Sequence, residues 1–259
     1  MRLRSMTAMM LWLGCWHAGA HGAERPVDLE LVIAVDASDS MDPGERRLQR
    51  SGYVAAFTAP DVVAAMLGGA VGRIAVAYVE WGDPGLIEVI APWTVIASAT
   101  DAAAFAGRLA AARMPAYTKT AIGEALWFCI GLFDGNGIAG ARRVIDLSGD
   151  GPSNLGRPVA AARDAAVAAG IVVNGLPIML RLDRPRGPFG LDFDRRELPR
   201  YFSECVIGGP GAFILPVYGL DGLGDAIRMK LRLEIAAARA PADAGGRVQP
   251  ASQAEWPCS

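Results

Sequence analysis

The chain has 259 residues, of which 52% are hydrophobic and 20% charged, and its formal net charge is −2. This composition allows a large apolar core and excludes a chain that is disordered throughout. The small net charge and the lack of a basic block argue against nucleic acid or an anionic membrane surface as the main partner.

Residues 1–23 have the layout of a secretory signal peptide. Arg2 and Arg4 precede an apolar stretch over residues 6–16, and small residues follow it. We expect cleavage after Ala20 or Ala23, and therefore a secreted or periplasmic protein. A permanent membrane-spanning helix would need about 20 apolar residues, which is more than this stretch provides.

The cysteines bear on the same question of compartment. A Leu-Gly-Cys sequence at Cys15 is similar to a lipoprotein cleavage site, so lipid anchoring through Cys15 is an alternative to plain secretion. Three cysteines remain after the signal, and a disulfide between Cys129 and Cys205 or between Cys205 and Cys258 is open. Both histidines lie in or beside the signal, which argues against histidine-based catalysis or zinc binding in the mature chain.

The remaining chain alternates between strands and helices. Residues 31–35 are a continuous run of branched apolar residues, which predicts a strand buried on both faces. The other expected strands cover residues 73–81, 86–96, 143–148, 171–180 and 212–217. The expected helices cover residues 45–67 (divided at Pro60), 101–113 (capped by Asp101), 120–133, 160–170, 194–206 and 222–238.

This order predicts one α/β domain over residues 27–238. Alternating strands and helices indicate a doubly wound, Rossmann-like sheet that is mostly parallel and has helices on both faces. The short turn between residues 81 and 86 makes one edge strand antiparallel, and Pro92 suits such an edge. Residues 239–259 lack periodicity, and we expect a disordered tail.

Oxygen-bearing side chains follow three of these predicted elements. Asp36, Ser38 and Ser40 come directly after the first buried strand, Thr120 opens a helix, and Asp150 follows the strand at residues 143–148. Ligands of open α/β sheets bind at the carboxyl ends of the strands, where these loops converge. Carboxylate and hydroxyl oxygens suit a hard divalent cation.

The motif Asp-x-Ser-x-Ser at residues 36–40, with Thr120 and Asp150 in the second and third loops, resembles the metal-ion-dependent adhesion site of von Willebrand factor A (VWA) domains. More narrowly, RIAVAYVEW, TAIGEAL and RRVIDLSGDGPSN are similar to DUF1194, a family of secreted bacterial proteins with this fold. The resemblance implies that Ser38, Ser40 and Thr120 bind Mg²⁺ directly, or Mn²⁺ or Ca²⁺ in its place. It implies that Asp36 and Asp150 bind directly or through water.

Simpler interpretations of the same residues remain open. Ser38 and Ser40 could cap the following helix, and Asp150 could be an ordinary turn residue. Thr118 could replace Thr120 as the hydroxyl ligand. Asp146 lies within a strand, which favours a structural carboxylate over a ligand. Asp39 stands where VWA domains often have glycine, and its role is open.

The leading functional hypothesis is a non-catalytic module that binds a protein partner. The resemblance implies that an Asp or Glu of the partner completes the coordination of the metal. One alternative is a Mg²⁺-dependent phosphatase with Asp36 as nucleophile, but Ser38 stands where such enzymes carry a second Asp. The other alternative is a periplasmic scaffold that works without metal, because a fold alone does not fix a function.

Overall fold

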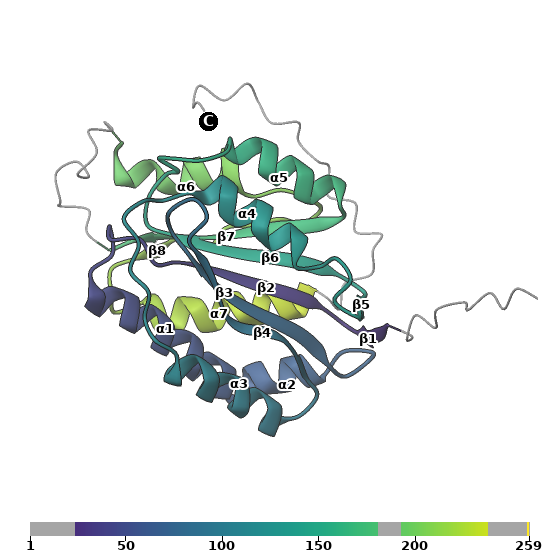
Figure 1. Ribbon diagram of the computed structural model, residues 1–259. Helices are drawn as coiled ribbons and strands as arrows, with labels where there is room; N and C mark the ends of the chain where they lie inside the picture. Colours follow the sequence, from purple (N-terminus) through teal and green to yellow (C-terminus); the bar gives the residue numbers. More distant parts are fainter. Residues whose placement is uncertain (1–23, 181–192, 238–257, 259) are drawn as a thin grey trace, which may run out of the picture.

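The computed structural model describes residues 24–180, 193–237 and 258. Its main sheet has six strands in the order β4-β3-β2-β6-β7-β8, drawn in Figure 1. All neighbours pair in parallel except β3 and β4, which are antiparallel. The strands are β2 (Glu30–Asp36), β3 (Ile74–Trp81), β4 (Ile87–Ile96), β6 (Arg143–Gly149), β7 (Ile171–Met179) and β8 (Val217–Tyr218).

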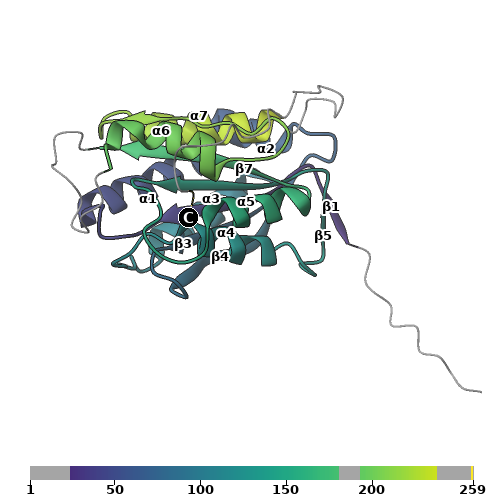
Figure 2. The same ribbon diagram turned by 90° about the horizontal axis from the view of Figure 1, so that it is seen from above.

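Helices cover both faces of this sheet, which confirms the predicted doubly wound fold. One face carries α1 (Pro43–Thr58), α2 (Pro60–Leu67), α3 (Ala99–Ala111) and α7 (Leu223–Ala237). The other carries α4 (Ile122–Gly131), α5 (Val159–Ala168), a short 3₁₀ turn η1 (Arg195–Glu197), α6 (Leu198–Tyr201) and a π-helical turn η2 (Phe202–Val206). Figure 2 shows α4 and α5 side by side over the sheet.

Successive side chains of β2 point alternately into the two helical layers. Leu31, Ile33 and Val35 pack toward α1 and α7, whereas Val32 and Ala34 pack toward α4 and α5. Every residue of β2 is buried, as expected for the central strand of a parallel sheet. Asp36 therefore has its position fixed by a rigid, fully covered strand.

The structure differs from the sequence prediction in several places, and the expected helix at 194–206 is divided into η1, α6 and η2. The structure adds a small parallel pair, β1 (Arg25–Val27) with β5 (Ile138–Gly140), whose three-residue strands are too short to show an alternating pattern. The expected strand at 212–217 is reduced to β8, because the preceding residues make only an isolated bridge from Ile214 to Gly175. Helix α3 is capped by Ser98 and not by Asp101, whose own N–H donates to the Ser98 hydroxyl.

Asp146 on β6 is a structural carboxylate, as its place within the strand predicted. The Lys230 ammonium lies 2.5 Å from Asp146 Oδ1 and 2.6 Å from Glu234 Oε1, and Asn174 donates to Glu234 Oε2. Burial alone would lower the pKa of Lys230, but the two carboxylates raise it above its usual value. The cluster joins α7 to the centre of the sheet.

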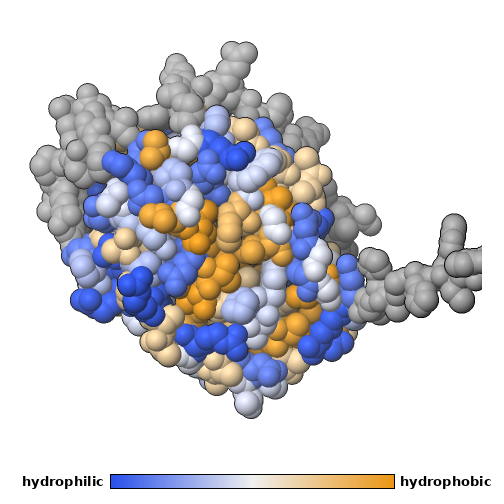
Figure 3. All heavy atoms as spheres, viewed as in Figure 1, coloured by the Kyte–Doolittle hydropathy of each residue, from blue (hydrophilic) through white to orange (hydrophobic). Residues whose placement is uncertain are grey.

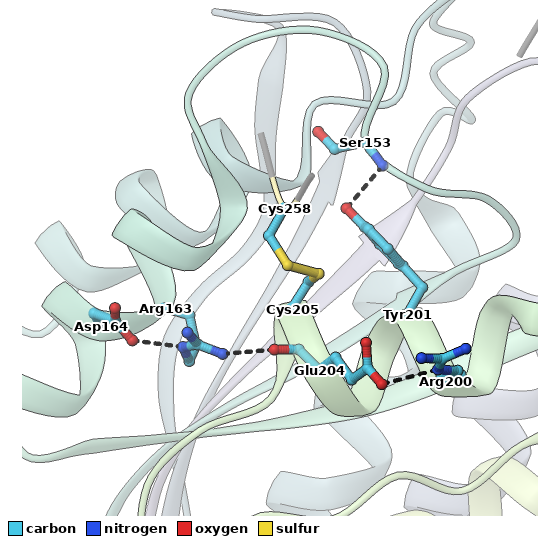
Figure 4. Close-up of a disulfide and its surroundings, with 8 residues drawn as sticks. All are labelled: Ser153, Arg163, Asp164, Arg200, Tyr201, Glu204, Cys205 and Cys258. Atoms are coloured by element: carbon cyan, nitrogen blue, oxygen red, sulfur yellow. Dashed lines mark hydrogen bonds and ion pairs between the residues drawn. A yellow bond between two sulfur atoms is a disulfide. The ribbon is translucent and has the colours of Figure 1, made fainter. Parts of the chain in front are cut away.

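A disulfide joins Cys205 of η2 to Cys258, which settles the open choice of pairing (Figure 4). Cys129 is free and fully buried on α4. The Cys258 carbonyl accepts a 3.0 Å hydrogen bond from the N–H of Val159, at the start of α5. Helix α5 has no side-chain cap, so Cys258 supplies an acceptor that its first turn lacks.

Hydrophobic residues gather in the middle of the face seen in Figure 1, with hydrophilic residues around them (Figure 3). Edge strand β4 contributes exposed Val89 to the surface of the protein.

No helix in the described part of the chain has the length and apolar character needed to cross a membrane. The expected signal peptide and most of the expected tail lie outside the described residues.

Candidate metal centre

The first site loop begins where β2 ends. Asp36 Oδ1 accepts a 2.8 Å hydrogen bond from the N–H of Ser38, which turns the chain back over the end of the strand. The hydroxyls of Ser38 and Ser40 lie 2.8 Å apart. Helix α1 is capped by Asp42, whose carboxylate accepts from the N–H groups of Gly44 and Glu45. The two serines are therefore not the helix cap, and their hydroxyls face the site.

The third loop contributes Asp150, which directly follows β6. Its side chain is only 3% exposed, and its Oδ1 accepts a 2.5 Å hydrogen bond from the Ser40 hydroxyl. Ser40 and Asp150 are 110 residues apart in the chain, so the contact is tertiary. This bond gives Asp150 a role beyond that of an ordinary turn residue.

The second loop carries Thr120 between the other two. The N–H of Tyr117 donates to the Ala37 carbonyl, and the N–H of Thr120 donates to Asn154 Oδ1 at 3.1 Å. The N–H of Asn154 returns a 2.9 Å bond to the Thr120 carbonyl. Backbone bonds thus tie the Thr120 loop to both neighbouring loops, and the Thr120 side chain is buried.

Thr118, the alternative hydroxyl ligand, is engaged elsewhere. Its hydroxyl and its N–H both donate to the carboxylate of Asp83. The loop also approaches the end of β3 so closely that a Cβ on Gly82 would lie 2.1 Å from Tyr117 Cβ. Only glycine at residue 82 allows this approach without displacing the backbone.

The site concentrates unsatisfied negative charge. Asp36 is 1% exposed, and its Oδ2 is buried without a hydrogen-bond partner in the described structure. Burial and the nearby charge of Asp150 raise the pKa of Asp36 to about 7. Burial likewise raises the pKa of Asp150, although the Ser40 hydrogen bond and Arg195 act in the opposite direction. A cation between these carboxylates would remove the cost of burying both.

Asp36, Ser38, Ser40 and Asp150 bring two carboxylates and two hydroxyls together, and Thr120 lies on a loop that is tied to both of theirs. Oxygen donors of this kind suit Mg²⁺ or Mn²⁺. No group of three or more His, Cys, Asp or Glu side chains with metal-binding geometry occurs among the described residues. The candidate centre depends on serine and threonine hydroxyls, and it contains only two carboxylates.

Comparison with known families identifies the chain. Residues 26–239 match the family model described as "Protein of unknown function (DUF1194)". The chain belongs to the DUF1194 family. A search of curated protein sequences gives no match.

Solved structures show that this DUF1194 protein has the VWA fold. Proximal thread matrix protein 1 of the mussel byssus, with a zinc-occupied MIDAS motif, is 18% identical with a TM-score of 0.59, over 82% of this chain and 49% of that one. The pilus adhesin SpaC of Lactobacillus rhamnosus GG is 15% identical with a TM-score of 0.58, over 82% and 30%. A von Willebrand factor type A protein of Catenulispora acidiphila is 19% identical with a TM-score of 0.56, over 81% and 43%. The DUF1194 chain spans less than half of each of these proteins.

Several residues around the DUF1194 site were not singled out from the sequence. Arg46 Nη1 donates to the carbonyls of Ser38 and Met41 and so holds the first loop in place. Arg195 Nη1 lies 3.6 Å from Asp150 Oδ2. No hydrophobic pattern or motif in the sequence indicates that either arginine belongs to the site. Asp39, whose role the sequence left open, is exposed.

Proposed function

We propose that this DUF1194 protein is a non-catalytic module that captures a protein partner through a divalent cation. Asp36, Ser38, Ser40, Thr120 and Asp150 would hold the cation. When bound, the cation supplies positive charge and a free coordination position that an Asp or Glu of the partner can fill. The chain's own contribution is to fix the donor oxygens before any cation arrives.

The buried Oδ2 of Asp36 is the observation that carries this proposal. Buried polar atoms almost always have a hydrogen-bond partner, so one without a partner calls for an explanation. It lies on a residue whose other oxygen is fixed by Ser38 and whose pKa is raised by burial and by Asp150. An oxygen of this kind, next to a second buried carboxylate, has the properties of a cation ligand.

One observation favours binding over phosphatase chemistry. A second Asp two residues after Asp36 would serve as acid and base in such an enzyme, but Ser38 stands there and its hydroxyl contacts Ser40.

We further propose that the protein acts in the periplasm or outside the cell, after removal of residues 1–23. The Cys205–Cys258 disulfide supports this location, because such bonds persist in oxidising compartments. The VWA-like neighbours, one with a zinc-occupied MIDAS motif and one a pilus adhesin, support metal-dependent binding as the mode of action.

The test is affinity capture with the immobilised chain from residue 24 onward. A partner that is retained in Mg²⁺ and released by EDTA supports the proposal, provided that Asp36→Ala retains none of it. Asp61→Ala, which changes a partly buried carboxylate of α2 that pairs with Arg228 of α7, is the matched control and should capture the partner normally. A partner that Asp36→Ala retains equally well would favour the metal-independent scaffold.

A further inference from the structure

Arg195 is placed to act on a ligand of the metal centre. It begins η1, and its guanidinium lies 3.6 Å from Asp150 Oδ2, with 18% of its side chain exposed. This separation is an ion pair but too long for a hydrogen bond. The other oxygen of Asp150 accepts from Ser40. Asp150 therefore lies between the serine hydroxyls and Arg195.

The local structure turns Arg195 toward the site and its neighbour Arg196 away from it. Asp194 caps η1 by accepting from the N–H of Arg196, and its carboxylate also binds the Arg196 guanidinium at 2.8 to 3.0 Å. The carboxylate of Asp194, which is next to Arg195 in the sequence, is thus paired with Arg196. Within the described residues, Arg195 makes no side-chain hydrogen bond, so its N–H donors remain available.

The contacts of Arg195 indicate what it can bind. A divalent cation would neutralise Asp36 and Asp150, so Asp150 would then be shared between the cation and Arg195. A carboxylate brings negative charge to both the cation and the guanidinium, whereas a neutral carbonyl or hydroxyl ligand brings none.

We propose that Arg195 is a specificity-determining residue that binds the carboxylate of the partner together with the cation. One carboxylate oxygen fills the free coordination position and the other accepts from the Arg195 guanidinium, whose planar donors match a carboxylate. This inference rests on the proposed metal-dependent function. It selects acidic side chains of the partner over neutral ones.

The test uses Mn²⁺, because a ligand that displaces water from this ion lowers the relaxation rate of the water protons. The probe is a short peptide, capped at both ends, with one glutamate, and the control peptide has glutamine in its place. We expect the glutamate peptide to displace water from the Mn²⁺-loaded chain and the glutamine peptide to have no effect. Arg195→Gln should require about tenfold more glutamate peptide. Arg195→Lys should lie between the two, and Arg196→Gln should match the unmodified chain.

The outcomes separate this inference from the proposed function. If the unmodified chain fails to bind Mn²⁺ before any peptide is added, the proposed function falls. If Mn²⁺ binds but Arg195→Gln responds to the glutamate peptide like the unmodified chain, the role of Arg195 is refuted and the metal centre stands. Arg195→Gln should bind Mn²⁺ itself at least as tightly as the unmodified chain, since it loses a nearby positive charge. Weaker Mn²⁺ binding would mean that Arg195 only positions Asp150, and would also overturn the inference.

Discussion

Replacing Lys230 by methionine should destabilise the fold strongly. The ammonium of Lys230 is 1% exposed and lies between the fully buried carboxylates of Asp146 and Glu234. Removal of one partner from a buried ion cluster leaves uncompensated charge, which typically costs roughly 3–5 kcal/mol. Asn174 still donates to Glu234 in the variant, but Asp146 Oδ2 already lacks a hydrogen-bond partner. We therefore expect a loss of about 4 kcal/mol in the free energy of unfolding at pH 8, within the same range.

The loss of stability should also depend on pH. In the unmodified chain the pKa of Lys230 is raised above 10.5, so its contribution is complete below that pH and is lost as the pH rises above it. Burial already raises the pKa of Glu234, and loss of the lysine charge raises it further. Protonation of Glu234 removes its unpaired charge in the variant. The stability difference between the two proteins should therefore shrink as the pH falls from 8 to 5.

Urea unfolding at several pH values measures both effects. Arg228→Met is the matched control on the same helix, because Arg228 makes an exposed ion pair with Asp61. It should change stability little and without this pH dependence. A loss from Lys230→Met below about 1 kcal/mol, or a loss that stays constant between pH 8 and pH 5, would refute the assignment of Lys230 as the counter-ion of a buried cluster.

Two other predictions concern the disulfide and the approach of the second loop. The Cys205–Cys258 bond closes a loop with a sequence separation of 53, and loop entropy predicts that Cys258→Ser lowers stability by about 4 kcal/mol. Calorimetric melting should show this loss as a lower melting temperature. A reductant that lowers the melting temperature of the variant as much as that of the unmodified chain would contradict it. Gly82→Ala should weaken Mn²⁺ binding at least tenfold, because its Cβ would lie 2.1 Å from Tyr117 Cβ and displace the Thr120 loop. Gly107→Ala, where the new Cβ meets nothing within 4 Å, should bind Mn²⁺ normally, and equal binding by both variants would mean that the loop position does not matter.

The sequence predicted the elements that have strong hydrophobic patterns. The run from Leu31 to Val35 identified the central strand, and Pro60 correctly separated α1 from α2. The sequence analysis missed β1 and β5 and overestimated the length of β8, because strands this short show no hydrophobic pattern. The cap of α3 was also misassigned, because Ser98 and Asp101 are both good capping residues and only the hydrogen bonds distinguish them.

The site was predictable as three loops but not as a charge distribution. Strand order brings Asp36 and Asp150 to one edge of the sheet, so their proximity follows from β2 pairing with β6. The contact of Ser40 with Asp150 and the approach of Arg195 depend on loop conformations that no local pattern encodes. Whether the five oxygen donors hold a cation remains a prediction of both the sequence and the geometry.

The most direct test of that central claim is a calorimetric titration of Mn²⁺ into the chain from residue 24 onward, alongside Asp36→Asn. We predict one saturable site in the unmodified chain and none in Asp36→Asn, while Asp39→Asn keeps the site. Asp36→Asn should also be no less stable without metal, because the substitution removes a buried carboxylate whose Oδ2 has no partner in the described structure. Absence of saturable binding to the unmodified chain, or equal binding to Asp36→Asn, would contradict the account.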